Sequence, residues 1–131
     1  MGGHPYQYVV EYDDDLQAAL DRLRQDVFAR GEYHGAERRP KTPEQALELA
    51  EATGTRSILD ILKVQEEPDY CCVAPLAPDE LQRYFGTDRP SPAAVEACDE
   101  FWEDLERGKA RCVVVYDGDE RKLFFAGYSF D

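Results

Sequence analysis

Hydrophobic and polar positions recur with two different periods along the chain, and each period predicts a different element. Residues 6–12 alternate with a period of two, which is typical of a β-strand. Apolar residues then recur at helical spacing between residues 16 and 27. The three aspartates before them suit a helix start, and Gly31 suits the position after its end. We expect a strand followed by an amphipathic helix.

A loop and a second helix follow. Residues 31–41 contain two glycines, a proline and four basic residues or histidines, which favours a loop. Thr42 can cap the next helix, Pro43 fits its first turn, and Gln45 completes a capping box. Gly54 is expected to end this helix.

Residues 57–64 are open to two interpretations. Their apolar positions fit a short helix, but their β-branched content and the turn QEEPD that follows favour a strand. As a strand, this segment would form a hairpin with residues 70–76.

The last third of the chain predicts two helices and a hairpin. A short helix begins at Pro78 and stops at Gly86. A longer amphipathic helix spans Ser91–Gly108, with Ser91 as its cap. Its expected apolar stripe consists of Ala94, Cys98, Phe101, Trp102 and Leu105. Strands at 112–116 and 123–130 are expected to pair through a turn at Asp117-Gly118.

These elements predict an α+β fold in one domain, residues 1–131. We expect a mostly antiparallel sheet of about five strands with helices packed on one face, an α/β sandwich. A hydrophobic fraction of 43% supports a folded chain. The sequence contains no run long and apolar enough to span a membrane, and its first residues do not resemble a signal peptide. The expected location is the cytoplasm.

Charge narrows the classes of partner. The formal net charge is −13, and residues 66–108 hold twelve acidic residues against three basic ones. Such a surface disfavours direct binding to nucleic acid and to anionic membranes, because both need lysine and arginine. A basic protein is the electrostatic complement.

The polar face of the 91–108 helix is the predicted partner-binding surface. It carries Glu96, Asp99, Glu100, Glu103, Asp104 and Glu106. We expect Glu96, Glu100 and Glu103 to lie at its centre and the other three at its rim, where truncation costs less.

No residue pattern indicates catalysis, a metal or a cofactor. The four cysteines form no C-x-x-C motif and lie far from both histidines, so zinc spacing is absent. We expect them to be reduced and mostly buried. Neither glycine-rich phosphate-binding motif occurs, and the acidic runs lack the spacing of a calcium loop.

Two classes of function remain. The first is an acidic protein-binding module, such as an immunity or inhibitor protein or a nucleic-acid mimic, that neutralises a basic partner. The second is a small-ligand-binding protein or an enzyme that uses a pocket between sheet and helices. The residues to inspect for that pocket are His34, Arg38, Arg39, Cys71, Cys72 and Tyr84. Sequence leaves the oligomeric state open.

Overall fold

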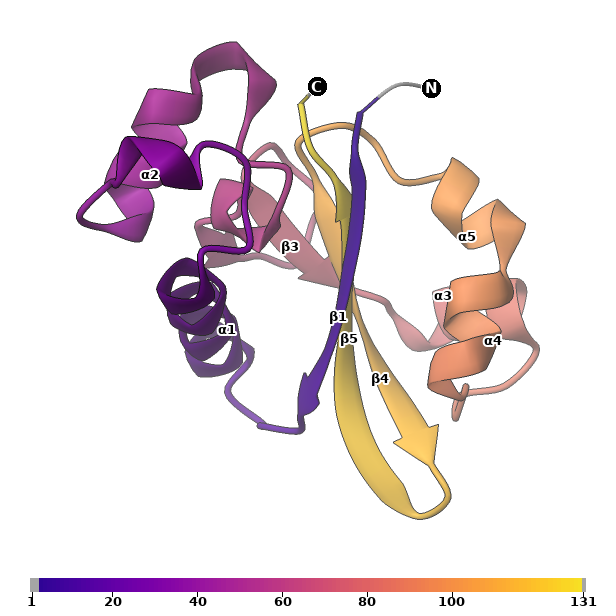
Figure 1. Cartoon of the computed structure of the whole chain (residues 1–131). Coiled ribbons are helices and arrows are strands. Elements are labelled where there is room, and N and C mark those ends of the chain that lie inside the picture. Colours follow the sequence, from indigo (N-terminus) through magenta and orange to yellow (C-terminus); the bar gives the residue numbers. More distant parts are fainter. Residues whose placement is uncertain (1–2, 131) are drawn as a thin grey trace.

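The computed structural model describes residues 3–130, which form one sheet between two layers of helices (Figure 1). The strands are β1 (Pro5–Glu11), β2 (Lys63–Val64), β3 (Cys72–Pro75), β4 (Ala110–Asp117) and β5 (Glu120–Tyr128). The α-helices are α1 (Leu16–Arg30), α2 (Pro43–Ala50), α3 (Pro78–Phe85), α4 (Pro92–Ala97) and α5 (Asp99–Glu103). Short 3-10 turns are η1 (Ala36–Arg38), η2 (Glu51–Thr53) and η3 (Ile58–Asp60).

The sheet is mixed, in the order β1-β5-β4-β3-β2. β5 pairs antiparallel with β1 and β4, whereas β3 pairs parallel with both β4 and β2. The α+β class is thus confirmed, but the expectation of a mostly antiparallel sheet is wrong. The expected hairpin at residues 63–75 is absent, because the two short strands β2 and β3 run side by side in the same direction.

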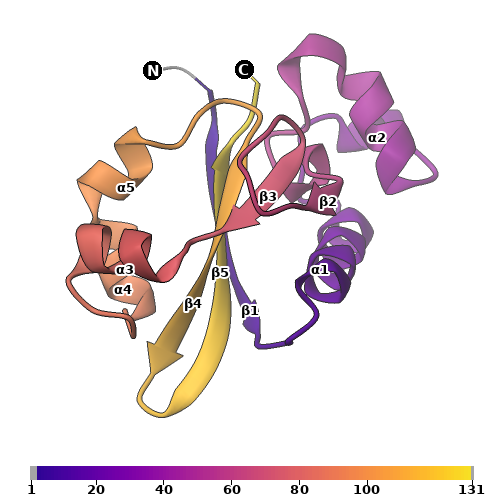
Figure 2. The same cartoon turned by 180° about the vertical axis from the view of Figure 1, so that it is seen from behind.

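Helices cover both faces of this sheet, so the expected packing on one face is also wrong. α1 and α2 lie on one side, and α3, α4 and α5 lie on the other, in both views (Figures 1 and 2). Each side has its own buried core: Leu20, Ile58 and Phe125 belong to the first, and Phe101 and Phe124 to the second. Neighbouring residues of a strand point to opposite faces, so the apolar runs in β4 and β5 supply both cores.

Most local capping signals in the first half are confirmed, although α2 ends at Ala50 and Gly54 instead ends the 3-10 turn η2. The Asp15 side chain accepts the Ala18 N–H and caps α1, and Gly31 ends it in the left-handed conformation. The Thr42 hydroxyl accepts the Gln45 N–H at 3.0 Å. The other half of the expected capping box differs, because the Gln45 side chain accepts the Lys41 N–H rather than that of Thr42.

Residues 57–64 form the 3-10 turn η3 followed by the two-residue strand β2, rather than one strand. The turn is held by a buried carboxylate. Asp60 is fully buried, and its Oδ1 accepts the N–H and hydroxyl of Thr55 at 2.6 and 2.8 Å. Because Asp60 bonds backward to Thr55, the chain turns where the β-branched pattern predicts extension.

The single helix expected over residues 91–108 is broken at Cys98 and ends near Asp104. Cys98 is extended (φ −83°, ψ 94°) and separates α4 from α5. Val95, Phe101 and Leu105 are all buried, and this spacing does not fall on one face of a continuous helix. The break turns both short helices so that each presents its apolar residue to the sheet.

The C-terminal hairpin is confirmed, with a turn one residue later than expected. Asp117 pairs with Glu120, so Gly118 and Asp119 form the loop, and Gly118 has φ +65°. Among residues 3–130, no helix is both long and apolar enough to cross a membrane.

Candidate protein-binding surface

The six acids predicted to bind a partner lie on two short helices and the turn after them. Glu96 is on α4, and Asp99, Glu100 and Glu103 are on α5. Asp104 and Glu106 follow in the turn, and all six are exposed; we call them the α4–α5 acidic surface. Because of the break at Cys98, these acids do not form one continuous helical row.

Side-chain and backbone contacts fix the junction between the two helices. The Trp102 indole N–H donates to the Val95 carbonyl at 3.2 Å, across the break. The Cys98 thiol donates to the Tyr84 carbonyl of α3 at 3.4 Å. The backbone that presents the acids is therefore anchored to its own neighbours and to α3.

Charge neutralisation divides the acidic surface in two. Asp104 accepts the Tyr84 hydroxyl at 2.5 Å, with Arg83 Nη2 3.8 Å from the same oxygen, and Glu106 lies 3.4 Å from Lys109 Nζ. Within residues 3–130, no ion pair involves the other four members of the surface, which are Glu96, Asp99, Glu100 and Glu103. These four carboxylates are available to a cation from outside the chain.

A polar cleft adjoins this surface beside α3. It consists of two hollows of about 200 and 330 Å³, both lined by Pro68, Glu80, Arg83 and Arg111. The first hollow also includes Asp104 and is thereby continuous with the α4–α5 acidic surface.

Further acids border the cleft on its other side. Glu66, Glu67 and Asp79 line the second hollow, and all three are exposed. Sequence reasoning did not include them in the site. The charge pattern of the sequence does indicate them, however, because the excess of acidic residues begins at Glu66 rather than at α4.

The floor of the cleft is an ion pair between α3 and β4. Arg111 donates two hydrogen bonds to the Glu80 carboxylate, and Glu80 also accepts the Ala77 N–H at 3.0 Å. Burial opposes ionisation of Glu80, but these bonds outweigh it and lower the pKa of the carboxyl group. The pKa of Tyr84 is shifted upward instead, because burial and the hydrogen bond to Asp104 both raise it.

The residues proposed for a small-ligand pocket are not brought together. His34 is exposed in the loop after α1, and its backbone N–H donates to the Thr55 carbonyl. Arg38 donates to the Leu49 carbonyl, and Arg39 is exposed beside it. These residues lie in the part of the chain that carries α1 and α2, whereas Tyr84 belongs to α3 on the opposite face.

The cysteines also lie apart from the hollows. Cys71 immediately precedes β3, and Cys72 is buried at its start. Neither hollow of the polar cleft is lined by His34 or by a cysteine. The described residues contain no group of three histidine, cysteine, aspartate or glutamate side chains arranged to hold a metal ion.

Comparisons with protein-family models, with characterised proteins and with solved structures gave no significant match. The features that bear on function are therefore those of the surface itself.

Proposed function

We propose that the protein is an acidic protein-binding module that neutralises a basic partner through the α4–α5 acidic surface. The observation that carries this proposal is the set of four exposed carboxylates, Glu96, Asp99, Glu100 and Glu103, that have no ion-pair partner among residues 3–130. Uncompensated carboxylates of one sign on an anchored backbone attract a cationic surface and raise its rate of association.

The polar cleft extends this surface. Glu66, Glu67 and Asp79 place more negative charge on the far side of the cleft from Asp104. A lysine or arginine side chain of the partner would thus meet carboxylates on both sides. An inhibitor, an immunity protein or a nucleic-acid mimic whose target has a basic binding face would use such an arrangement.

Charge reversal tests the proposal. The test variant combines Glu96→Lys, Glu100→Lys and Glu103→Lys. Its matched control combines Glu37→Lys, Glu48→Lys and Asp119→Lys, three exposed acids outside the surface. Both triple variants have the same net charge, so they differ only in where the charge was changed.

Each protein is immobilised and exposed to a native lysate of its source cells, and retained proteins are identified by mass spectrometry. Wild type and control should retain the same basic protein and release it as salt is raised, because salt screens exposed charges. The α4–α5 variant should not retain it. Equal retention by that variant, or retention of no basic protein by wild type, would show the proposal to be wrong.

A further inference from the structure

The outer edge of β1 carries main-chain hydrogen-bonding groups that no strand satisfies. β1 ends the sheet and pairs only with β5. The Ser129 N–H donates to the His4 carbonyl, which fixes the alternation of the antiparallel ladder. Residues 4, 6, 8 and 10 therefore direct their main-chain groups to β5. Gln7, Val9 and Glu11 direct theirs away from the sheet.

Two of the usual devices that prevent pairing at a sheet edge, proline and lysine, are absent from these three positions. None of Gln7, Val9 and Glu11 is proline or lysine, and the one proline of the strand, Pro5, stands at its first residue. Val9 is 45% exposed although it is apolar. In Figure 1, β1 lies in front of the other strands with no other ribbon crossing it.

We propose that a second copy of this chain pairs with this edge, β1 against β1, antiparallel about a two-fold axis at Val9. This register places Val9 opposite the partner's Val9 and Gln7 opposite the partner's Glu11. The valines form an apolar contact, and the Gln7 amide can donate to the Glu11 carboxylate across the strands. Both sheets then join into one continuous sheet.

Two other registers of the same edge fit less well. Centring the axis on Glu11 places two carboxylates directly opposite each other, which is destabilising. Centring it on Gln7 places Pro5, which has no N–H, opposite Val9. The Val9 register avoids both faults.

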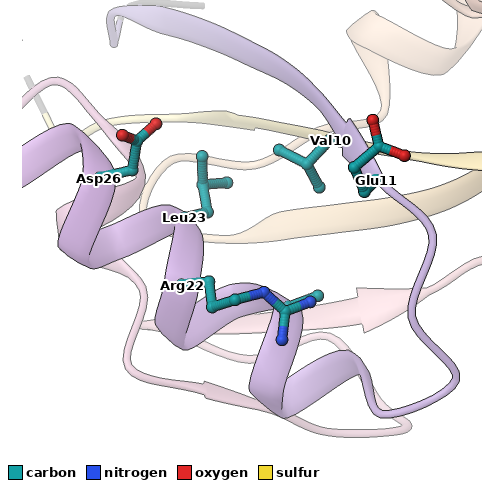
Figure 3. A pocket seen from close by; sticks show the side chains of 6 residues that line it. Val10, Glu11, Arg22, Leu23 and Asp26 are labelled. Carbon is teal, nitrogen blue, oxygen red and sulfur yellow. The ribbon is translucent and has the colours of Figure 1, made fainter.

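A hollow next to β1 also supports the Val9 register. It lies on the opposite face of the strand from the Val9 side chain. Val10 of β1 and Leu23 of α1 point into a hollow of about 220 Å³ (Figure 3). In the Val9 register, the partner's Tyr8 lies directly opposite Val10, at the mouth of this hollow. Association would thus cover apolar surface that the single chain leaves accessible to water.

Local charge favours a second copy over a basic peptide. Both acids that line the hollow are paired within the chain, Asp26 with Arg30 and Glu11 with Lys122 at 3.9 Å, and the lining Arg22 pairs with Asp13 at 2.8 Å. Little negative charge at this edge is therefore left without an ion-pair partner that a cation could replace, unlike at the α4–α5 acidic surface. The net charge of −13 opposes association of two copies mainly at long range, where salt screens it.

Val9→Pro tests the pairing, because the Val9 N–H points away from β5 and its loss leaves the internal ladder intact. Val9→Thr is the matched control, since it keeps the N–H and a β-branched side chain. Val9→Lys is a second test variant that keeps the N–H and sets two like charges opposite each other. Circular dichroism checks that each variant retains the wild-type fold.

Sedimentation equilibrium over a range of protein concentrations gives the oligomeric state. Wild type and Val9→Thr should dimerise. The dissociation constant of the Val9→Pro dimer should be about tenfold higher or more, because two main-chain hydrogen bonds are lost per dimer. Hydrogen exchange of the Gln7, Val9 and Glu11 amides should slow as protein concentration rises. Added salt should strengthen the dimer, whereas it weakens capture of a basic partner, so the two proposals fail separately.

Three results would overturn this inference. The first is a wild-type protein that stays monomeric at every concentration and salt level. This result would overturn the inference even if the strand of another protein were found to pair with the β1 edge. The second is a Val9→Pro or Val9→Lys variant that dimerises as wild type does. The third is exchange of the three amides that does not depend on protein concentration.

Discussion

Arg111 of β4 holds Glu80 of α3 in a two-pronged ion pair, with N–O distances of 2.7 and 3.1 Å. The same guanidinium donates to the carbonyls of Ala74 and Pro75 at the end of β3. One side chain thus joins a helix and two parallel strands beneath the polar cleft. Both partners are mostly shielded from water, so this pair contributes more than a surface ion pair.

Replacement of Glu80 by glutamine should destabilise the fold at neutral pH. The substitution keeps the shape but removes the charge that Arg111 faces, and we expect a loss of about 1–3 kcal/mol in the free energy of unfolding. Urea unfolding followed by circular dichroism measures it. Glu67→Gln is the control, because Glu67 lines the same cleft but is exposed and should change stability little.

The destabilisation caused by Glu80→Gln should depend on pH in a defined direction. The pKa of Glu80 is lowered in the folded state. Its contribution is therefore complete above the ordinary carboxyl pKa of about 4.3 and is lost as pH falls through the lowered value. Wild type and variant should converge in stability as pH falls below this lowered pKa. A difference that stays constant from neutral to acidic pH would contradict the assigned role of this ion pair.

Gly127→Ala should be strongly destabilising for steric reasons alone. A Cβ at this position would lie 2.5 Å from the Tyr6 hydroxyl oxygen and 2.9 Å from the Lys109 carbonyl oxygen, so Tyr6 or β4 must shift. We expect a loss of about 1–3 kcal/mol or more, together with a changed near-UV spectrum of the buried tyrosine. Gly86→Ala provides the comparison, because its left-handed backbone is strained by a side chain but the surrounding space is open. A native near-UV spectrum in Gly127→Ala would show that Tyr6 does not pack on this glycine.

The four thiols should differ in reactivity with iodoacetamide at about pH 8. Burial raises the pKa of Cys112 to about 12, and Cys72 is also buried with a raised pKa. Neither should react before unfolding. Cys71 and Cys98 are half-buried and should be modified first, with Cys71 slowed because burial and the nearby Asp60 raise its pKa. Peptide mapping after timed labelling gives the order, and early modification of Cys112 would contradict its burial in β4.

Sequence predicted the elements whose determinants are local. Asp15, Thr42, Ser91 and Gly86 act at the helix ends where they were expected, since a cap depends on residues within one turn. The C-terminal hairpin has the same local origin, because its loop contains Gly118 between long apolar strands.

Predictions that depended on distant contacts failed. The β-branched content of residues 57–64 favoured a strand, but the buried turn η3 is also held from β1, where the Tyr8 hydroxyl accepts the Ile58 N–H at 3.4 Å. The apolar spacing around Cys98 resembled one helix until the second core required Val95 and Phe101 to face the same sheet. Neither requirement is visible without the neighbouring elements.

The candidate surface was partly accessible to sequence reasoning. The exposed acids of α4 and α5 follow from the charge pattern alone, although whether they bind a partner is still a prediction. The polar cleft was not predicted, because Glu80 and Arg111 lie thirty-one residues apart and meet only when α3 packs on β4. The free edge at Gln7, Val9 and Glu11 was equally hidden, since it depends on which strand ends the sheet.

The pairing of β1 with β5 has a consequence for the order of folding. These strands lie more than a hundred residues apart in the sequence, yet each residue from Pro5 to Glu11 has its partner between Lys122 and Tyr128. Such non-local contacts form late, because the intervening chain must first be brought together at an entropic cost. On the ribosome, β1 and the aromatic side chains it carries therefore wait without a sheet until β5 has emerged. The first core is therefore completed only when β5 pairs with β1, so the first strand of this sheet in sequence order is among the last to be placed.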